Sequence, residues 1–209
     1  MAHAPPLPKA RLEAITDAIF GVTMTLLVID LKIPEPSPTQ TLFDELTRLV
    51  DRIDNYVISF VVLAVFWVGH VRMLRRIGDV DTTFVALNLA FLLFTTLVPP
   101  LTTLFGENPG LPRAAVLYGG TLLGILLCET LMWYRTCHHL ANDSLVNPLG
   151  TWQLVRRRYA LAIGVVLAGI AAALIEIVIG AEANLAPWLY LLLIGAGIVR
   201  PPVHGVPRA

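Results

Sequence analysis

The sequence contains few charged residues for its length. Of its 209 residues only 14% are charged, whereas 56% are hydrophobic and the mean hydropathy is +0.72. A soluble domain of average composition carries about 25% charged residues. Most of the surface of this protein is therefore expected to face lipid. The formal net charge is zero, which argues against nucleic acid as a partner.

The sequence also lacks the short motifs of common catalytic and metal sites. It contains no Ser/His/Asp nucleophile motif, no P-loop and no H-E-x-x-H, so an enzyme is not predicted. Cys128 and Cys137 lie near the predicted inner end of one helix, which argues against a disulfide framework. Cys137 with His138 and His139 matches no common zinc spacing, so we expect an interfacial cluster there, with no metal and no cofactor.

Long apolar runs make up most of the chain. A membrane-spanning helix needs about 20 mostly apolar residues, and the sequence predicts an all-α membrane protein with six of them. The predicted spans are roughly 12–33, 55–75, 82–105, 113–134, 158–180 and 186–199. They form a single domain over 1–209, with a short N-terminal tail at 1–10 and a C-terminal tail at 200–209.

Local signals refine this division. Glu13 and Asp17 interrupt the first apolar run, which therefore reads as a retained helix and not as a signal peptide. Pro99-Pro100 is expected to kink or end the third span. Residues 42–57 repeat apolar side chains at helical spacing, which predicts an amphipathic helix that continues into the second span.

The distribution of lysine and arginine predicts the orientation of the spans. With six spans, eleven of the fifteen basic residues fall on one side of the membrane and four on the other. Basic residues are enriched on the cytoplasmic side, so both termini are predicted to be cytoplasmic. The opposite side holds seven acidic residues against four basic ones. This excess either concentrates cations at a pore entrance or complements the basic inner face, and the sequence favours neither interpretation.

The first span carries an aliphatic stripe and, away from it, a set of polar side chains. At about 100° per residue, the stripe contains Ile15, Ile19, Val22, Leu26, Ile29 and Ile33. Thr16, Thr23 and Asp30 lie on another line, and Asp17 points to a third side. If the stripe faces lipid, the polar groups meet neighbouring helices. If the stripe lines a pore, it gates that pore by dewetting.

Motifs in the first half of the chain resemble one family of membrane proteins. Arg11, Ile15, Thr16 and Asp17 are similar to the R-x-x-x-F-S-D signature of the transmembrane-protein-175 family, the endolysosomal potassium channel and its bacterial relatives. The resemblance covers roughly residues 11–110 and includes Thr25-Leu26-Leu27, Phe66-Trp67, His70, Asn88, Phe91-Leu92, Pro99 and Gly106-Glu107. Ile15 replaces the Phe of the family and Thr16 replaces its Ser, which keeps the hydroxyl. His70 stands alone where many relatives carry a second His.

This resemblance implies a homotetramer of six-helix subunits, with the first helices lining a central pore. The implied function is a potassium-permeable channel for K⁺ and other monovalent cations in a bacterial plasma membrane. The family has no TVGYG-type filter, and this sequence has none either. Selectivity is implied to come from an aliphatic constriction on the first helix. That constriction falls here at Val22, Leu26 and Ile29, which are three members of the stripe.

The signature residues are expected to form contacts between helices. A charge at the bilayer centre costs at least ~2.5 kcal/mol, so Arg11 and Asp17 are expected near the inner boundary and paired. They lie six residues apart on different helix faces, so their partners are expected on other helices. The predicted network consists of Arg11, Thr16, Asp17, Trp67, His70 and Asn88. It fixes the rotation of the first helix, or it serves only as general interhelical contact.

A proton-coupled secondary transporter is the alternative function. Glu129, Glu176 and Asp17 are carboxylates within predicted spans, and such groups mark proton relays. For Glu129 and Glu176 we expect instead that each side chain pairs with a polar neighbour or extends to the membrane–water interface. The sequence shows no internal duplication of the kind common in transporters. The run Arg156–Arg158 either binds anionic lipid or serves as a topology signal.

Overall fold

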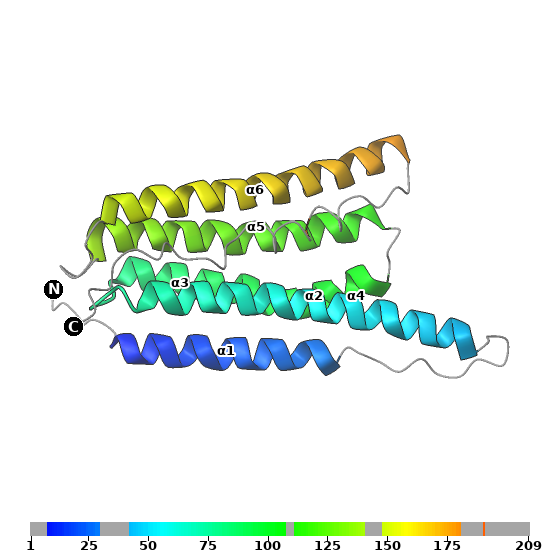
Figure 1. Ribbon diagram of the computed structural model, residues 1–209, viewed down its shortest axis with the longest axis horizontal. Helices are drawn as coiled ribbons and strands as arrows, with labels where there is room; N and C mark the ends of the chain where they lie inside the picture. Colours follow the sequence, from blue (N-terminus) through cyan, green and yellow to red (C-terminus); the bar gives the residue numbers. More distant parts are fainter. Residues whose placement is uncertain (1–7, 30–41, 108–110, 141–147, 181–189, 191–209) are drawn as a thin grey trace.

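The computed structural model describes residues 8–29, 42–107, 111–140, 148–180 and Tyr190. The secondary structure of the described residues is helical (Figure 1). The elements are α1 (Lys9–Ile29), α2 (Leu42–Leu74), α3 (Thr82–Thr96), α4 (Val98–Glu107), α5 (Pro112–Arg135), the π-helix η1 (Thr136–Leu140) and α6 (Pro148–Ile179). Residue ranges 30–41, 141–147 and 181–189 and both termini lie outside the described residues.

Five helical segments are long and apolar enough to cross a membrane. They are Lys9–Ile29, Tyr56–Leu74, Thr82–Phe105, Pro112–Leu140 and Thr151–Ile179. These segments correspond to the first five predicted spans. The predicted sixth span, 186–199, lies outside the described residues except for Tyr190. Its helical state therefore stays a prediction.

The third span is interrupted where the sequence predicted a kink. The α3 helix ends at Thr96, and the backbone N–H of Leu97 still bonds the carbonyls of Phe94 and Thr95. The α4 helix then begins at Val98, so Pro99 and Pro100 stand in its first turn. Proline lacks the backbone N–H, which that turn does not need. The two helices together cross as one span.

One long helix has the extent that the sequence predicted, and another begins earlier than predicted. The amphipathic segment at 42–57 does continue into the second span, which makes α2 a helix of 33 residues. The α6 helix begins at Pro148, ten residues before the predicted start at 158. The predicted start was wrong because it was placed at the arginine run. Arginine is a good helix former, so a helix continues past the apolar boundary.

The α5 helix forms the centre of the subunit. It packs along α6 on one side and along α3 and α4 on the other, whereas α1 packs on α2, α3 and α4. Figure 1 places α1 and α6 at opposite sides of the bundle. Close packing needs small residues on α5: a Cβ at Gly124 would lie 2.7 Å from the Phe94 ring. Real Cβ atoms do not approach that closely, so glycine sets the α3–α5 distance.

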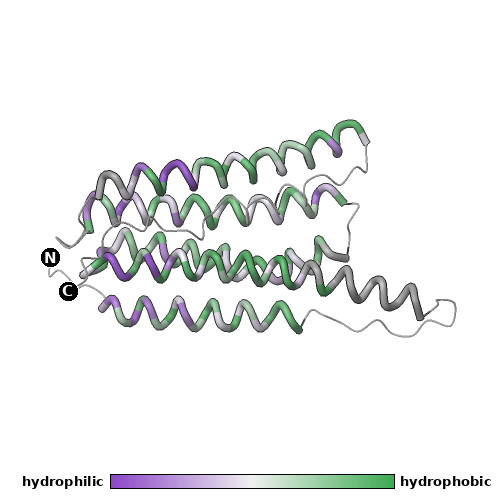
Figure 2. Tube along the Cα trace, in the orientation of Figure 1, coloured by the Kyte–Doolittle hydropathy of each residue, from purple (hydrophilic) through white to green (hydrophobic). Residues whose placement is uncertain are grey.

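Polar residues gather at one end of the bundle (Figure 2). The α1 and α6 helices begin at this end, and α2 and α5 finish there. It carries described basic residues of these four helices and of the turn after α2: Lys9, Arg11, Arg72, Arg75, Arg76, Arg135, Arg156, Arg157 and Arg158. The end defined by these residues is called the basic end below.

Candidate pore-lining helix and its polar anchor

The α1 helix has a buried face and an exposed face. Its buried side chains are Leu12, Thr16, Phe20, Thr23 and Leu27, which recur every three or four residues. The predicted constriction lies on the other face, with Val22 58%, Leu26 41% and Ile29 69% exposed. At ~1.5 Å rise per residue, these three side chains cover about 10 Å of the helix. They form an apolar surface without a covering partner among the described residues of this subunit.

Other members of the predicted stripe are placed less uniformly. Ile15 is exposed, Ile19 is half-buried, and Ile33 lies outside the described residues. Val28 is also 51% exposed but points to another side of α1. Exposure of a large apolar side chain in one subunit fits lipid, a pore or a subunit contact. The polar contacts of α1 with its neighbouring helices indicate how α1 is rotated about its own axis.

Thr16 connects α1 to α3. Its hydroxyl donates to the carbonyl of Leu12 at 2.8 Å and accepts from Asn88 Nδ2 at 3.0 Å. Both side chains are buried, with 1% of Thr16 and none of Asn88 exposed. In lipid each polar group needs an internal partner, and the threonine hydroxyl has one as a donor, Leu12, and one as an acceptor, Asn88.

Asp17 connects α1 to α2. Its Oδ1 accepts a hydrogen bond from Trp67 Nε1 at 2.8 Å. An indole N–H donates only, so a carboxylate is a suitable acceptor for it. The contact lies at the edge of the subunit, because both side chains are exposed. Thr16 and Asp17 are adjacent and contact different helices, so together they fix both the rotation and the position of α1.

His70 and Arg11 are placed differently from the other predicted network residues. His70 is fully buried and stacks on Phe91, with ring centroids 5.0 Å apart, and Phe91 in turn contacts Phe20 of α1 at 5.7 Å. Neither ring nitrogen of His70 bonds a described atom. Arg11 is exposed, and its side chain forms no hydrogen bond or ion pair with another described residue. Within one subunit, the expected partner of Arg11 is therefore not found among the described residues.

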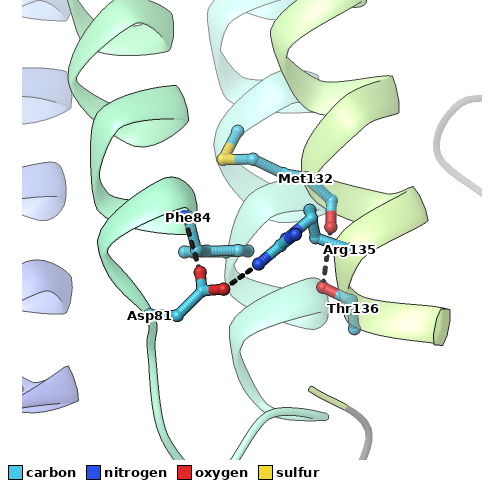
Figure 3. A network of polar contacts seen from close by, with 5 residues as sticks. All are labelled: Asp81, Phe84, Met132, Arg135 and Thr136. Atoms are coloured by element: carbon cyan, nitrogen blue, oxygen red, sulfur yellow. Dashed lines mark hydrogen bonds and ion pairs between the residues drawn. The ribbon is translucent and has the colours of Figure 1, made fainter. Parts of the chain in front are cut away.

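A second set of contacts ties the basic end together. The Lys9 ammonium donates to the carbonyl of Ile77 at 2.8 Å and lies 3.6 Å from Glu13. Asp81 caps α3 by accepting from Phe84 N at 2.8 Å, and its other oxygen pairs with Arg135 of α5 (Figure 3). The connection between α2 and α3 is thus held to both α1 and α5.

Sequence reasoning missed the Asp81–Arg135 pair. Arg135 was counted only as a topology signal, and its partner is 54 residues away along the chain. The available signal was the aspartate directly before an apolar run. Aspartate is a preferred N-cap residue because its oxygen accepts from an unpaired N–H of the first turn.

Glu129 lies inside the subunit and away from α1. It is 0% exposed, and its carboxyl has the Tyr159 hydroxyl of α6 as a polar neighbour. A Cβ at Gly69 of α2 would lie 3.1 Å from Glu129 Oε1 and 3.9 Å from the Tyr159 hydroxyl of α6. Of the two expectations for Glu129, the polar neighbour is present, whereas the side chain does not reach the interface, because three helices enclose it. Glu176 is likewise buried, at 5% exposure.

The cysteine and histidine residues at 137–139 lie at the end of α5. Cys137 is buried with a free thiol, whereas His138 and His139 are exposed on the π-helix η1. Within the described residues, no group of three His, Cys, Asp or Glu side chains is arranged to hold a metal ion.

Comparisons with known proteins agree with this geometry. The family of the endosomal/lysosomal potassium channel TMEM175 matches residues 11–99, which contain the α1 anchor and its partners. A protein of Chamaesiphon minutus, named a potassium channel, is 31% identical over 139 residues, covering 64% of this chain and 68% of that protein. A protein of Streptomyces collinus, also named a potassium channel, is 28% identical over 159 residues, covering 73% of this chain and 76% of that protein.

A solved structure is similar over most of the fold. The crystal structure of a lysosomal potassium-selective channel TMEM175 homolog from Chamaesiphon minutus matches with a TM-score of 0.69 and 26% identity. The match covers 88% of this chain and 96% of that chain. The resemblance seen in Arg11, Thr16 and Asp17 therefore extends to the arrangement of the helices, and the chain belongs to the TMEM175 family of membrane channels.

Proposed function

We propose that this protein is a potassium-permeable channel in which the α1 helices of four subunits line a central pore. The observation that carries the proposal is the exposed stripe of Val22, Leu26 and Ile29, which lies on a different side of α1 from the buried Thr16–Asn88 contact. Membership of the TMEM175 family and its potassium-channel relatives support it.

The stripe supplies an apolar constriction. Four copies of Val22, Leu26 and Ile29 around an axis surround a path that offers no oxygen ligand to a cation. Such a constriction conducts only where water can enter, and small changes in its width switch it between wet and dry. The permeant species is K⁺, and the proposed conduction path requires no bound cofactor.

The polar anchor holds this surface toward the axis. Residues of an α-helix that are seven apart, such as Thr16 and Thr23, face nearly the same way. Both are buried against the subunit, so turning α1 would expose hydroxyls and bury the stripe. The Asp17–Trp67 bond resists the same rotation from a second helix. We assign Arg11 to a partner in a neighbouring subunit or to lipid headgroups.

The orientation follows from the basic end. Nine described lysine and arginine residues gather there, and basic residues are retained on the cytoplasmic side. We therefore assign the start of α1 to the cytoplasm of a bacterium and the protein to its plasma membrane. Six spans per subunit, with the sixth at 186–199, return the C-terminus to the same side.

A proton-coupled transporter is the second candidate, and one observation favours it. Glu129 is a fully buried carboxyl whose polar neighbour is the Tyr159 hydroxyl, and such groups in membrane helices often carry protons. Glu176 and Asp17 are the other carboxylates to consider. A channel passes many ions per opening and gives unitary current steps, which a transporter does not.

The test of the pore face compares Leu26 with Val28. Both are exposed aliphatic residues of α1, two positions apart and on different sides of the helix. Leu26→Ala and Leu26→Asn are expected to raise the current and weaken the preference for K⁺ over Na⁺, because the apolar ring becomes wider or wetter. The measurement is whole-cell current and reversal potential at matched surface expression. If Val28 variants change both quantities and Leu26 variants do not, the assigned pore face is wrong.

A further inference from the structure

An aromatic cluster joins α5, η1 and α6 at the basic end. The Tyr134 ring lies 4.5 Å from the His138 ring and 5.4 Å edge-on from the Trp152 ring, centroid to centroid. His138 also lies 6.0 Å edge-on from Trp152. Tyr134 reaches His139 as well, at 6.3 Å, because the π-helix turn places residues five apart close together. Tyr134, His138 and His139 are exposed, so the cluster forms an open surface.

Two arginines extend this surface along α6. Arg156 follows Trp152 by four residues and therefore lies one turn further on the same side of the helix. Arg157 is its neighbour, and both side chains are exposed. Neither arginine forms an ion pair with another described residue. Segments 130–140 and 148–175 contain no acidic residue. Arg135, by contrast, turns away to Asp81.

The depth of these arginines corresponds to the lipid headgroups. The 21 residues from Tyr159 to Ile179 form about 31 Å of helix at ~1.5 Å per residue. This length matches the hydrocarbon thickness of roughly 30 Å. The first two turns of the apolar segment that begins at Thr151 therefore project beyond the hydrocarbon. Tyrosine and tryptophan rings are typical of the same level.

We propose that Arg156 and Arg157, with Trp152, Tyr134 and His138, form a binding site for the headgroup of an anionic phospholipid of the inner leaflet. The arginines pair with the phosphate, and the aromatic rings contact the glycerol and the first methylenes of the acyl chains. This rests on the proposed channel, because α6 lies opposite α1 (Figure 1) and an α1 that faces the pore axis leaves α6 on the lipid side.

The experiment measures binding of a fluorescent phosphatidylglycerol to the purified, delipidated protein in a neutral detergent. Each arginine near an anionic lipid surface contributes about a fivefold gain in affinity. Arg156→Gln/Arg157→Gln is therefore expected to weaken binding by about 25-fold, whereas Arg156→Lys/Arg157→Lys retains most of it. The control Arg75→Gln/Arg113→Gln also removes two exposed arginines, and it should change binding less than twofold.

Three results would overturn the proposal. The control could weaken binding as much as the test variant, which would indicate attraction by overall charge. Phosphatidylcholine could bind as tightly as phosphatidylglycerol, which would indicate a general apolar surface. Inorganic phosphate at millimolar concentration could displace the lipid completely, which would indicate a free-phosphate site. Lipid binding is measured without ion flux, so an intact protein that binds lipid but passes no current would contradict only the channel proposal.

Discussion

The hydrogen bond between Thr16 and Asn88 offers a quantitative test of how α1 is held. Thr16→Val keeps the shape of the side chain but removes the hydroxyl that accepts from Asn88 Nδ2 at 3.0 Å. The Asn88 amide is fully buried, so it cannot turn to water for a replacement. A buried polar group left without its partner costs about 1–3 kcal/mol. We expect Thr16→Val and Asn88→Leu each to lower the free energy of unfolding by an amount within this range.

The double variant separates the shared bond from other effects. Interhelical hydrogen bonds in membranes contribute ~0.6 kcal/mol on average and up to ~1.7 kcal/mol. Because Thr16 and Asn88 are both almost completely buried, we expect a coupling energy of about 1–1.7 kcal/mol, within that upper range. Thr16→Val/Asn88→Leu should therefore lose less stability than the sum of its two single variants.

The assay is unfolding of the purified protein by titrating sodium dodecyl sulfate into a mild detergent, followed by circular dichroism. Thr16→Ser keeps the hydroxyl and should stay within about 0.5 kcal/mol of the wild type. Thr25→Val is the second control, because the Thr25 hydroxyl is exposed and bonds only the carbonyl of Val22 in its own helix. A coupling energy of zero, or a Thr16→Ser variant as unstable as Thr16→Val, would refute the assignment of this contact as the anchor of α1.

Three further predictions address the anchor, the packing and the topology. Asp17→Ala removes the acceptor of the Trp67 indole. It should lower the recovery of tetramer in size-exclusion chromatography and leave the reversal potential nearly unchanged. Normal tetramer recovery with a large shift of the reversal potential would place Asp17 in the pore. Gly124→Ala would place a Cβ 2.7 Å from the Phe94 ring and should lower the free energy of unfolding by about 1–3 kcal/mol. The control Gly120→Ala, whose Cβ would have no atom within 4 Å, should leave that free energy unchanged or raise it by up to about 1 kcal/mol. Equal effects of the two variants would disprove the close α3–α5 contact. Cysteine labelling should reach residues 136–157 from the cytoplasmic side and residues 35–53 from outside; labelling of 35–53 from the cytoplasm would reverse the orientation.

Much of the architecture could be predicted because lipid imposes simple rules on sequence. Apolar length located five spans, and Pro99-Pro100 located the break between α3 and α4. The start of α6 could not be located in this way, because hydropathy marks where a helix enters lipid and not where it begins. The residues at 148–157 are polar enough to leave the membrane and still form helix.

The site was predictable in part, because two contacts, Thr16–Asn88 and Asp17–Trp67, join residues of the predicted network. Thr16 and Asn88 had to meet partners inside the bundle, and the structure brings them together. Arg11 and His70 had no such constraint on their partners, since a surface arginine reaches water or lipid and a buried imidazole can stack on an aromatic ring. The place of Glu129 beside Gly69 of α2 depends on helix packing, which residue spacing does not encode.

The most direct test of the proposed function is a recording from the purified protein in a planar bilayer, with K⁺ on one side and Na⁺ on the other. A channel lined by the α1 stripe predicts unitary current steps and a reversal potential shifted toward the K⁺ equilibrium potential. The steps should persist without a proton gradient, because the pore offers no carboxylate at Val22, Leu26 or Ile29. Absence of unitary steps, together with K⁺ flux that requires a proton gradient and is lost in Glu129→Gln, would contradict the channel and establish the transporter.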